Sequence, residues 1–277
     1  MEKRGLKVHS SKLFYKLLRH LGFNLFDDYC DAFLVSRSDQ FRNRVTITDV
    51  YQIITFDEQL SKVLSFWLLK VEKAVRAGWI EYMARRDIYG SPFAYLDPQY
   101  YRKREFHKAL ITNLQKAWFS SNEPNVQIFR AKYCEQNLPP VWYLTPILTF
   151  GSLSKWISAL NIDVQRDLYA TMGLPDHTKF AQTGLHSLVL ARNQCAHGKR
   201  IWNKRFPVSF VTEPDLSRQY EYKVRALLEL LELVISGLKL NEDKFAKDLS
   251  TVFARLPKWQ KPYMGWKLTG PIKWTLV

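Results

Sequence analysis

Three polar residues near the end of a predicted helix are the strongest candidates for chemistry in this 277-residue chain. The helix begins near Leu185 with apolar residues at helical spacing and ends at Gly198, a residue type that commonly stops helices. Its last two turns hold Arg192, Asn193 and His197. Because a guanidinium holds phosphate and an imidazole transfers protons, this pattern predicts a site that handles phosphate.

The spacing of these residues decides which of them can act together. Asn193 and His197 are four residues apart and share a helix face, whereas Arg192 lies about 140° around the helix from His197. To act together with His197, the side chain of Arg192 must therefore bend toward the end of the helix. Alternatively, it contacts a second subunit. RNA can be cleaved without a metal ion when its own 2′-hydroxyl attacks the adjacent phosphate. That reaction needs a base, an acid, and a cation that stabilises the negative charge on the phosphorane. His and Arg can fill these roles. The alternative is that both residues only place favourable charge at a helix C-terminus.

The charge of the chain favours a polyanionic partner. There are 41 Lys and Arg against 26 Asp and Glu, which gives a net charge of +15. Such an excess fits nucleic acid or an anionic membrane surface. No segment resembles a transmembrane helix or a cleaved leader, so we expect RNA and no membrane partner. A basic protein without any such partner is the alternative.

Clusters of basic residues are the predicted RNA contacts. One follows the helix end and combines cations with an aromatic ring, and two others lie at the start of predicted helices: Lys199, Arg200, Trp202, Lys204 and Arg205; Arg102, Lys103 and Arg104; Lys12, Lys16 and Arg19. The alternative for the cations is a solvated face, and for Trp202 it is packing in the core.

The cysteines indicate the cellular compartment and which cofactors to expect. Cys30, Cys134 and Cys195 are odd in number and widely spaced, which fits neither a disulfide framework nor a zinc site. We therefore expect a cytoplasmic protein with no metal and no cofactor.

Helical periodicity dominates the chain and predicts an all-α fold. The longest predicted helix, over residues 47–86, is expected to have Thr48 or Asp49 as its N-terminal cap. Helices are expected over residues 10–22, 47–86, 101–119, 126–136, 143–160, 162–172, 177–197 and 214–238. We expect one domain over residues 1–277, with a basic helical segment at 1–46, a helical core at 47–240, and an irregular aromatic tail at 241–277.

Several stretches of the sequence resemble known family signatures. Arg192 to His197 is similar to the R-x4-6-H motif of the HEPN superfamily. The longer stretch 190–203 resembles the signature of Abi-like abortive-infection proteins of the AbiD/AbiF type. Four further stretches match family patterns in order, with Ser61 where an Arg usually follows the first of them: 51–60 (LYxFDxxLR), 72–76 (E-x3-R), 148–155 (LSFGxLSK) and 256–259 (fPxxW).

This resemblance implies a HEPN-type helical bundle with extra helices, a toxin role in antiviral defence, and metal-independent RNA cleavage. It makes Arg192 and His197 the catalytic pair, with Asn193 positioning His197 or the phosphate. Glu72 and Arg76 match a charged pair that holds Arg192 in place. The alternative for that pair is an ordinary exposed ion pair four residues apart, worth a few tenths of a kcal/mol.

The resemblance also implies partners. Only one R-x4-H stretch, Arg192 to His197, lies in the family-like signature, whereas HEPN nucleases generally combine two such motifs, so we expect a homodimer. Some members are associated with small structured noncoding RNAs, which makes such an RNA a further expected partner. Two other hypotheses stay open here: a non-catalytic protein that holds a structured noncoding RNA, and a helical scaffold without an RNA role.

Overall fold

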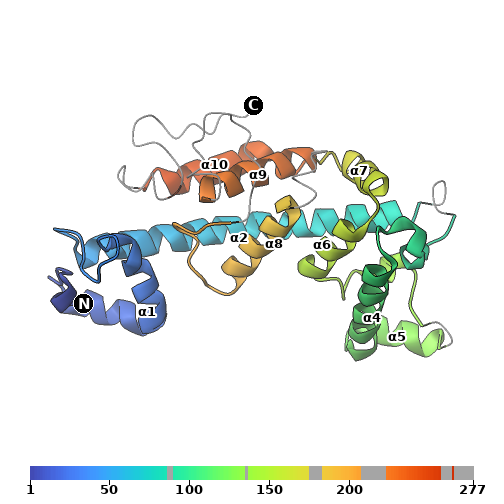
Figure 1. Cartoon of the computed structure of the whole chain (residues 1–277), viewed down its shortest axis with the longest axis horizontal. Coiled ribbons are helices and arrows are strands. Elements are labelled where there is room, and N and C mark those ends of the chain that lie inside the picture. The colour runs from blue at the N-terminus through green and yellow to red at the C-terminus, as the bar shows by residue number, and fades with distance from the viewer. Residues whose placement is uncertain (86–89, 135–136, 175–182, 207–222, 257–263, 265–277) are drawn as a thin grey trace. The chain divides into compact units, whose positions relative to one another are not determined.

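The computed structural model describes residues 1–85, 90–134, 137–174, 183–206, 223–256 and 264 (Figure 1). Within these ranges the regular structure is helical and forms no sheet, which confirms the all-α prediction. The aromatic tail expected near the C-terminus, including Pro257 and Trp259 of the 256–259 stretch, lies outside the described residues.

The first long helix, α1, spans Ser11–Cys30 and follows a short 3-10 helix, η1, at Glu2–Arg4. The Ser10 hydroxyl caps α1 by accepting a hydrogen bond of 3.3 Å from the Leu13 N–H. Gly22, expected to end this helix, instead forms a kink with φ of 73°, and the helix then continues to Cys30. The continuation is stabilised by packing, since Phe26, Tyr29 and Cys30 are all buried.

The longest helix, α2, spans Ile47–Met83, close to the predicted range of 47–86. Its cap is Thr46, so the expectation of Thr48 or Asp49 is wrong. Thr46 and Asp49 form a capping box, in which the Asp49 N–H donates to Thr46 Oγ1 at 3.2 Å and the Thr46 N–H donates to Asp49 Oδ2 at 2.8 Å. The apolar residues whose spacing predicts this helix are buried, except Val63, which is half-buried. The buried ones are Ile53, Phe56, Leu60, Leu64, Trp67, Leu68 and Val71.

The middle of the chain forms shorter helices near the predicted positions. Between Asp31 and Thr171 they are η2 (Asp31–Phe33), η3 (Ala94–Leu96), η4 (Pro98–Tyr100), α4 (Arg104–Ser120), α5 (Pro124–Lys132), η5 (Val141–Leu144), α6 (Phe150–Ala159) and α7 (Ile162–Thr171). The predicted helix at 143–160 is interrupted, because Pro146 lies between η5 and α6.

The last helices are α8 (Leu185–Ala196), α9 (Val224–Gly237) and α10 (Glu242–Phe253). Residues 177–182 and 214–222, predicted as the first turns of α8 and α9, lie outside the described residues. Helix α10 corrects the expectation of an irregular tail from residue 241. Glu242 and Asp243 lie in its first turn, where they complement the helix dipole. Phe245, Leu249 and Val252 form its buried stripe.

The chain forms two compact units. The first comprises 1–68, 190–229 and 242–277, and the second comprises 69–189 and 230–241. In the first unit, the Trp67 ring lies edge-on to Phe245, and its indole N–H donates to Asp248 at 3.0 Å. These contacts attach α10 to α2. In the second unit, an aromatic cluster around the buried Trp156 ring joins several elements: Trp79, Tyr95, Tyr101, His107 and Trp156.

Two glycines in the second unit allow the chain to approach itself at backbone distance. Gly173 has φ of +67°, and a Cβ built on it would lie 2.5 Å from the carbonyl oxygen of Gly237. A Cβ on Gly237 would collide with the carbonyl oxygen of Gly173. Both clashes are with backbone atoms, which cannot rotate away. The turn after α7 and the end of α9 therefore require glycine at both positions.

Replacing Gly237 by alanine tests this approach. We expect Gly237→Ala to lower the free energy of unfolding by about 2 kcal/mol, because the new methyl forces the two backbones apart. Gly151→Ala in α6 is the matched control, since its Cβ would meet Val189 at an ordinary 3.7 Å. Urea denaturation should show the control unchanged or stabilised by about 0.5 kcal/mol or more. Equal stability of the two variants would contradict the proposed contact.

Candidate functional site

The end of α8 has the geometry that the sequence predicts. Gly198 has φ of +59°, its N–H donates to the Cys195 carbonyl at 3.1 Å, and the Lys199 N–H donates to the Gln194 carbonyl at 2.9 Å. These two bonds define a Schellman motif, which satisfies carbonyls that the helix end leaves open. Gly198 therefore ends the helix one residue after His197 and turns the chain sharply.

One face of α8 is fixed to α2 within the first unit. Ala191 and Cys195 are buried, and the Cys195 thiol is hydrogen-bonded with Ser61 and Ser65 of α2. Burial raises the pKa of the thiol, while these hydrogen bonds oppose the rise. Ser61 is the residue that replaces the usual Arg of the family pattern. Here its hydroxyl contributes to holding the last turns of α8 in place.

The three motif residues lie on the part of α8 that this packing leaves accessible. Arg192 and Asn193 are half-buried and His197 is exposed. The guanidinium Nη1 of Arg192 donates to Asn193 Oδ1 at 3.2 Å. The structure thus brings Arg192 and Asn193 together, and the amide of Asn193 orients the guanidinium. The imidazole of His197 is open to a ligand or to a second protein chain.

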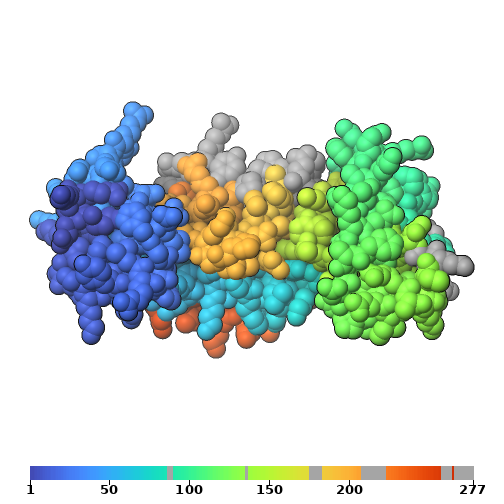
Figure 2. Space-filling model, turned by 90° about the horizontal axis from the view of Figure 1, so that it is seen from below, coloured from blue at the N-terminus to red at the C-terminus, as the bar shows by residue number. Residues whose placement is uncertain are grey.

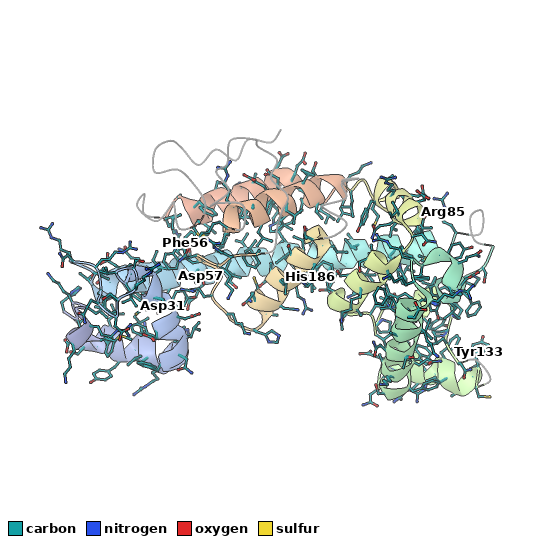
Figure 3. The ribbon with its side chains drawn as sticks, viewed as in Figure 1. Asp31, Phe56, Asp57, Arg85, Tyr133 and His186 are labelled. Carbon is teal, nitrogen blue, oxygen red and sulfur yellow. The ribbon has the colours of Figure 1, made fainter. Side chains whose placement is uncertain are left out.

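A buried carboxylate on α2 holds the segment that follows the motif. Asp57 lies on α2 (Figure 3), and it is only 2% exposed. Its Oδ1 accepts the Trp202 N–H at 2.6 Å, and its Oδ2 accepts both the Ile201 N–H at 3.0 Å and the Tyr29 hydroxyl at 2.6 Å. One side chain therefore joins α1, α2 and the chain directly after α8. Sequence reasoning gave Asp57 no role, although it lies in the family-like stretch 51–60.

The environment of Asp57 is costly for a charge. Burial raises its pKa to about 6, although the hydrogen bonds from Tyr29, Ile201 and Trp202 and the nearby charge of Arg200 oppose the rise. At neutral pH the group is a carboxylate whose acceptor oxygens are satisfied by three donors. A buried anion in this state depends on keeping each of those donors.

The structure corrects the expected RNA contact of Trp202. Its side chain is fully buried and stacks on Phe33, with ring centroids 6.0 Å apart. A ring inside the core offers no face to a base. Trp202 therefore packs in the core, which was the alternative to an RNA contact. Its neighbour Arg200 is also engaged, because its guanidinium bonds the Asp28 carbonyl and lies 3.8 Å from the Asp28 carboxylate. Both residues attach the post-motif segment to the N-terminal part of the chain.

Cations nevertheless accumulate after the motif. Lys199 and Arg205 are exposed, and Lys204 is half-buried. Lys223, at the start of α9, donates to Asn203 Oδ1 at 2.5 Å. Burial lowers the pKa of Lys223, and the charges of Arg205 and Arg200 lower it further. This mutual repulsion shows a locally positive potential, which an anion would relieve.

The other predicted RNA contacts are all exposed, but they differ in the contacts that their side chains make. Arg102 donates to the Leu160 carbonyl at 2.8 Å and to Gln165 Oε1 at 2.8 Å, so its guanidinium joins the start of α4 to α6 and α7. Lys103 and Arg104 are exposed, and the Lys103 ammonium lies 5.3 Å from the centre of the Phe106 ring. The three cations of α1, Lys12, Lys16 and Arg19, are exposed.

The charged pair on α2 is more than a surface ion pair. Glu72 is 4% exposed, and its Oε1 accepts a hydrogen bond of 2.6 Å from Arg76 Nη2. The alternative of an ordinary exposed pair is therefore wrong, because removing one partner would leave a buried charge uncompensated. The expected action of Glu72 and Arg76 on Arg192 stays a prediction.

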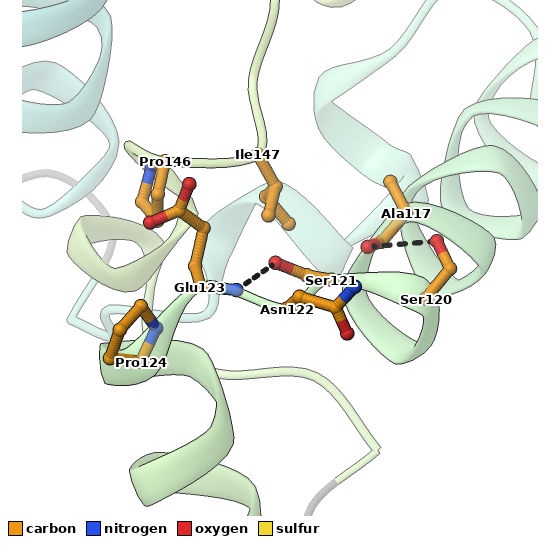
Figure 4. Close-up of a pocket in the computed structure, with 8 residues that line it drawn as sticks. All are labelled: Ala117, Ser120, Ser121, Asn122, Glu123, Pro124, Pro146 and Ile147. Atoms are coloured by element: carbon orange, nitrogen blue, oxygen red, sulfur yellow. Dashed lines mark hydrogen bonds between the residues drawn. The ribbon is translucent and has the colours of Figure 1, made fainter.

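Three hollows that the structure describes in the second unit contain none of the candidate catalytic residues. One, between the end of α4 and the start of α5, is lined by small and polar residues whose hydrogen bonds are local, such as the Glu123 N–H donating to Ser121 Oγ at 3.2 Å (Figure 4). A second, of about 460 Å³, includes residues 147–149 and Lys155 and so lies along the family-like stretch 148–155. The motif residues line none of these three hollows.

Fold and site together define an all-α protein with an exposed imidazole and a half-buried guanidinium at the end of a core helix. The model of the Abi-like protein family matches residues 16–203, more than half of the chain. The chain therefore belongs to the Abi-like protein family, which associates it with abortive infection, a form of phage defence. The match contains Asp57, the Glu72–Arg76 pair and the α8 motif. No match was found among curated proteins or solved structures.

Two findings concern the described helices and the cysteines. Among the helices that the structure describes, none combines the length and the apolar character that a membrane span requires. Cys30, Cys134 and Cys195 are all free thiols.

Replacing Asp57 by asparagine tests the carboxylate that holds the post-motif segment. One acceptor oxygen becomes an amide donor facing other donors, so we expect the free energy of unfolding to fall by about 2 kcal/mol at pH 7. Asp163→Asn on α7, where the carboxylate is exposed, is the control and should change it by less than about 0.5 kcal/mol. Urea denaturation gives both values, and a loss no larger than the control would contradict the role of Asp57.

The same variants test the pKa of Asp57. The folded value of about 6 exceeds the unfolded value of about 4, so the folded chain binds this proton more tightly. The contribution of Asp57 to the free energy of unfolding therefore falls as pH rises between those values and is constant above them. Denaturation at several pH values should show this slope in the native protein and in Asp163→Asn, but a weaker slope in Asp57→Asn.

Proposed function

We propose that this chain is a HEPN-type ribonuclease of abortive infection, a toxin that binds RNA and cleaves it without a metal ion. The observation that carries the proposal is the end of α8. There Asn193 orients the guanidinium of Arg192, and His197 is exposed one residue before the chain turns at Gly198. Membership of the Abi-like family and the net charge of +15 support it.

The chemistry uses the nucleophile that RNA supplies itself. The 2′-oxygen attacks the adjacent phosphorus while a base removes its proton, and the bond from phosphorus to the 5′-oxygen breaks as an acid protonates that oxygen. The products are a 2′,3′-cyclic phosphate and a 5′-hydroxyl. His197 takes or gives a proton, and Arg192 stabilises the added negative charge on the phosphorane. Asn193 keeps the guanidinium oriented for that purpose.

The rest of the structure supports this assignment through position. Cys195 fixes one face of α8 on α2, and Asp57 fixes the segment that follows the motif. The motif is therefore held on both sides of Gly198. Such support reduces the reorganisation that catalysis would otherwise require. The exposed cations Lys199 and Arg205 then hold the RNA backbone beside it.

A homodimer completes the site. One chain supplies one His197, whereas the reaction uses a base and a separate acid. In the dimer, His197 of one protomer acts as the base and the partner's His197 acts as the acid. A small structured noncoding RNA is proposed as a further partner, held through its backbone by dispersed cations.

Cleavage of end-labelled RNA by the purified protein in the presence of EDTA tests the catalytic assignment. We expect Arg192→Ala and His197→Ala to slow cleavage by about 100-fold or more, and Asn193→Ala by about ten-fold, because the first two remove groups that act on the reacting phosphate. Lys247→Ala on α10, an exposed cation outside the motif, is the control and should cleave as the native protein does.

The outcomes separate the candidate functions. If His197→Ala cleaves at the native rate, the assignment of His197 is wrong. If neither protein cleaves but both bind RNA alike, the chain is a non-catalytic RNA-binding protein. If RNA binding is absent or insensitive to salt, both RNA functions fail, since phosphate contacts weaken as salt rises.

Mixing the native protein with an inactive variant tests the dimer. With RNA in excess, adding His197→Ala should lower the cleavage rate, because mixed dimers hold only one imidazole. Light scattering should give twice the single-chain mass of 32.7 kDa. A single-chain mass, together with a rate unaffected by the added variant, would contradict a shared site.

A further inference from the structure

The exposed face of α1 combines cations with an aromatic ring. Lys12, Lys16 and Arg19 follow one another at steps of four and three residues, and Tyr15 lies three residues after Lys12 and four before Arg19. All four therefore lie on one side of the helix before its kink at Gly22. All four side chains are exposed, and Tyr15 is 68% exposed. Figure 2 shows this N-terminal part of the chain, in dark blue, at the surface of the first unit.

The ring of Tyr15 contacts Phe14, which in turn packs against a buried ring. Its edge contact with Phe14 joins ring centroids 5.8 Å apart at 65°, and Phe14 packs edge-on against the buried Phe26 at 5.6 Å. The inner side of α1 also buries Leu17. This edge contact leaves most of the Tyr15 ring exposed, so a face of the ring is available to a ligand.

The positive charge of this face is not neutralised from α1. The stretch 11–21 contains no acidic residue. The nearest acids along the helix, Asp27 and Asp28, are already engaged by Arg4 at 3.0 Å and by Arg200 at 3.8 Å. Glu58 of α2 lies 3.5 Å from His20, at the flank of the face. Lys12, Lys16 and Arg19 therefore present their charge outward.

We propose that this face of α1 binds a single-stranded segment of RNA, in which one base stacks on Tyr15 while Lys12, Lys16 and Arg19 contact the phosphates on either side. The proposal rests on the proposed RNA-binding function and deepens it by assigning a second contact surface on a different helix from the motif. An aromatic ring among cations fits a strand with unpaired bases, because a paired base has no free face to stack on the ring. An anionic membrane would also contact the cations, and vesicles are therefore one arm of the test.

Binding is best measured with His197→Ala as the parent protein, so that the RNA stays intact. The probes are a fluorescent single-stranded oligonucleotide, the same sequence as an RNA duplex, and vesicles containing anionic lipid. Replacing Tyr15 by leucine should weaken single-strand binding by about ten-fold, whereas Tyr15→Phe keeps the ring and should stay within about two-fold. Tyr51→Leu on α2, an exposed tyrosine outside this face, is the matched control and should bind like the parent.

The charge of the face is tested by salt. Removing Lys12, Lys16 and Arg19 together should reduce the slope of log affinity against log salt by about 2, since each phosphate contact on a single strand contributes about 0.7. Lys247→Ala should leave the slope unchanged. If the parent binds RNA and the α1 variants bind like their controls, the proposed face is wrong while the RNA function stands. If the parent binds no RNA, the proposed function itself fails. Equal binding of duplex and single strand, or preference for vesicles, would also overturn this face.

Discussion

The first unit of this protein depends on one buried carboxylate. Asp57 accepts hydrogen bonds from the Tyr29 hydroxyl and from the backbone of Ile201 and Trp202, and so joins three parts of the chain that are far apart in sequence. Burial disfavours its charge and raises its pKa, which means that its donors must all be present for the ion to be tolerated. The position of the chain after α8 is consequently determined by an interaction that permits little variation.

The end of α8 is constrained in three independent ways. Cys195 and Ala191 pack the inner face, Gly198 closes the helix with a left-handed turn, and Asp57 holds the chain immediately beyond it. What this leaves accessible is the pair Arg192–Asn193 and the imidazole of His197. A cation and a proton-transferring group held beside a turn, near further cations, form the kind of arrangement that phosphate chemistry requires. The match to the Abi-like protein family covers all of these residues.

Much of the fold was predictable from the sequence, because helical periodicity is a local signal. The buried stripe of α2 and the stop at Gly198 followed from residue types at fixed spacing. The cap at Thr46 was missed because Thr46, Thr48 and Asp49 are all good capping residues, and only the structure shows which pair bonds. Trp202 was assigned to RNA because composition cannot distinguish an exposed ring from one that stacks on Phe33 in the core. Asp57 was missed since its donors lie about 30 and 145 residues away in sequence.

We propose that Arg192 and His197 direct the 2′-oxygen of RNA onto the adjacent phosphorus. The most direct measurement is the chemistry of the ends that the purified protein leaves on a defined RNA, read by mass spectrometry of the fragments. We expect 2′,3′-cyclic phosphate and 5′-hydroxyl ends, and we expect these ends to be absent from the reaction with His197→Ala. Fragments with 3′-hydroxyl and 5′-phosphate ends would contradict this proposal, because those ends require attack by water rather than by the RNA itself.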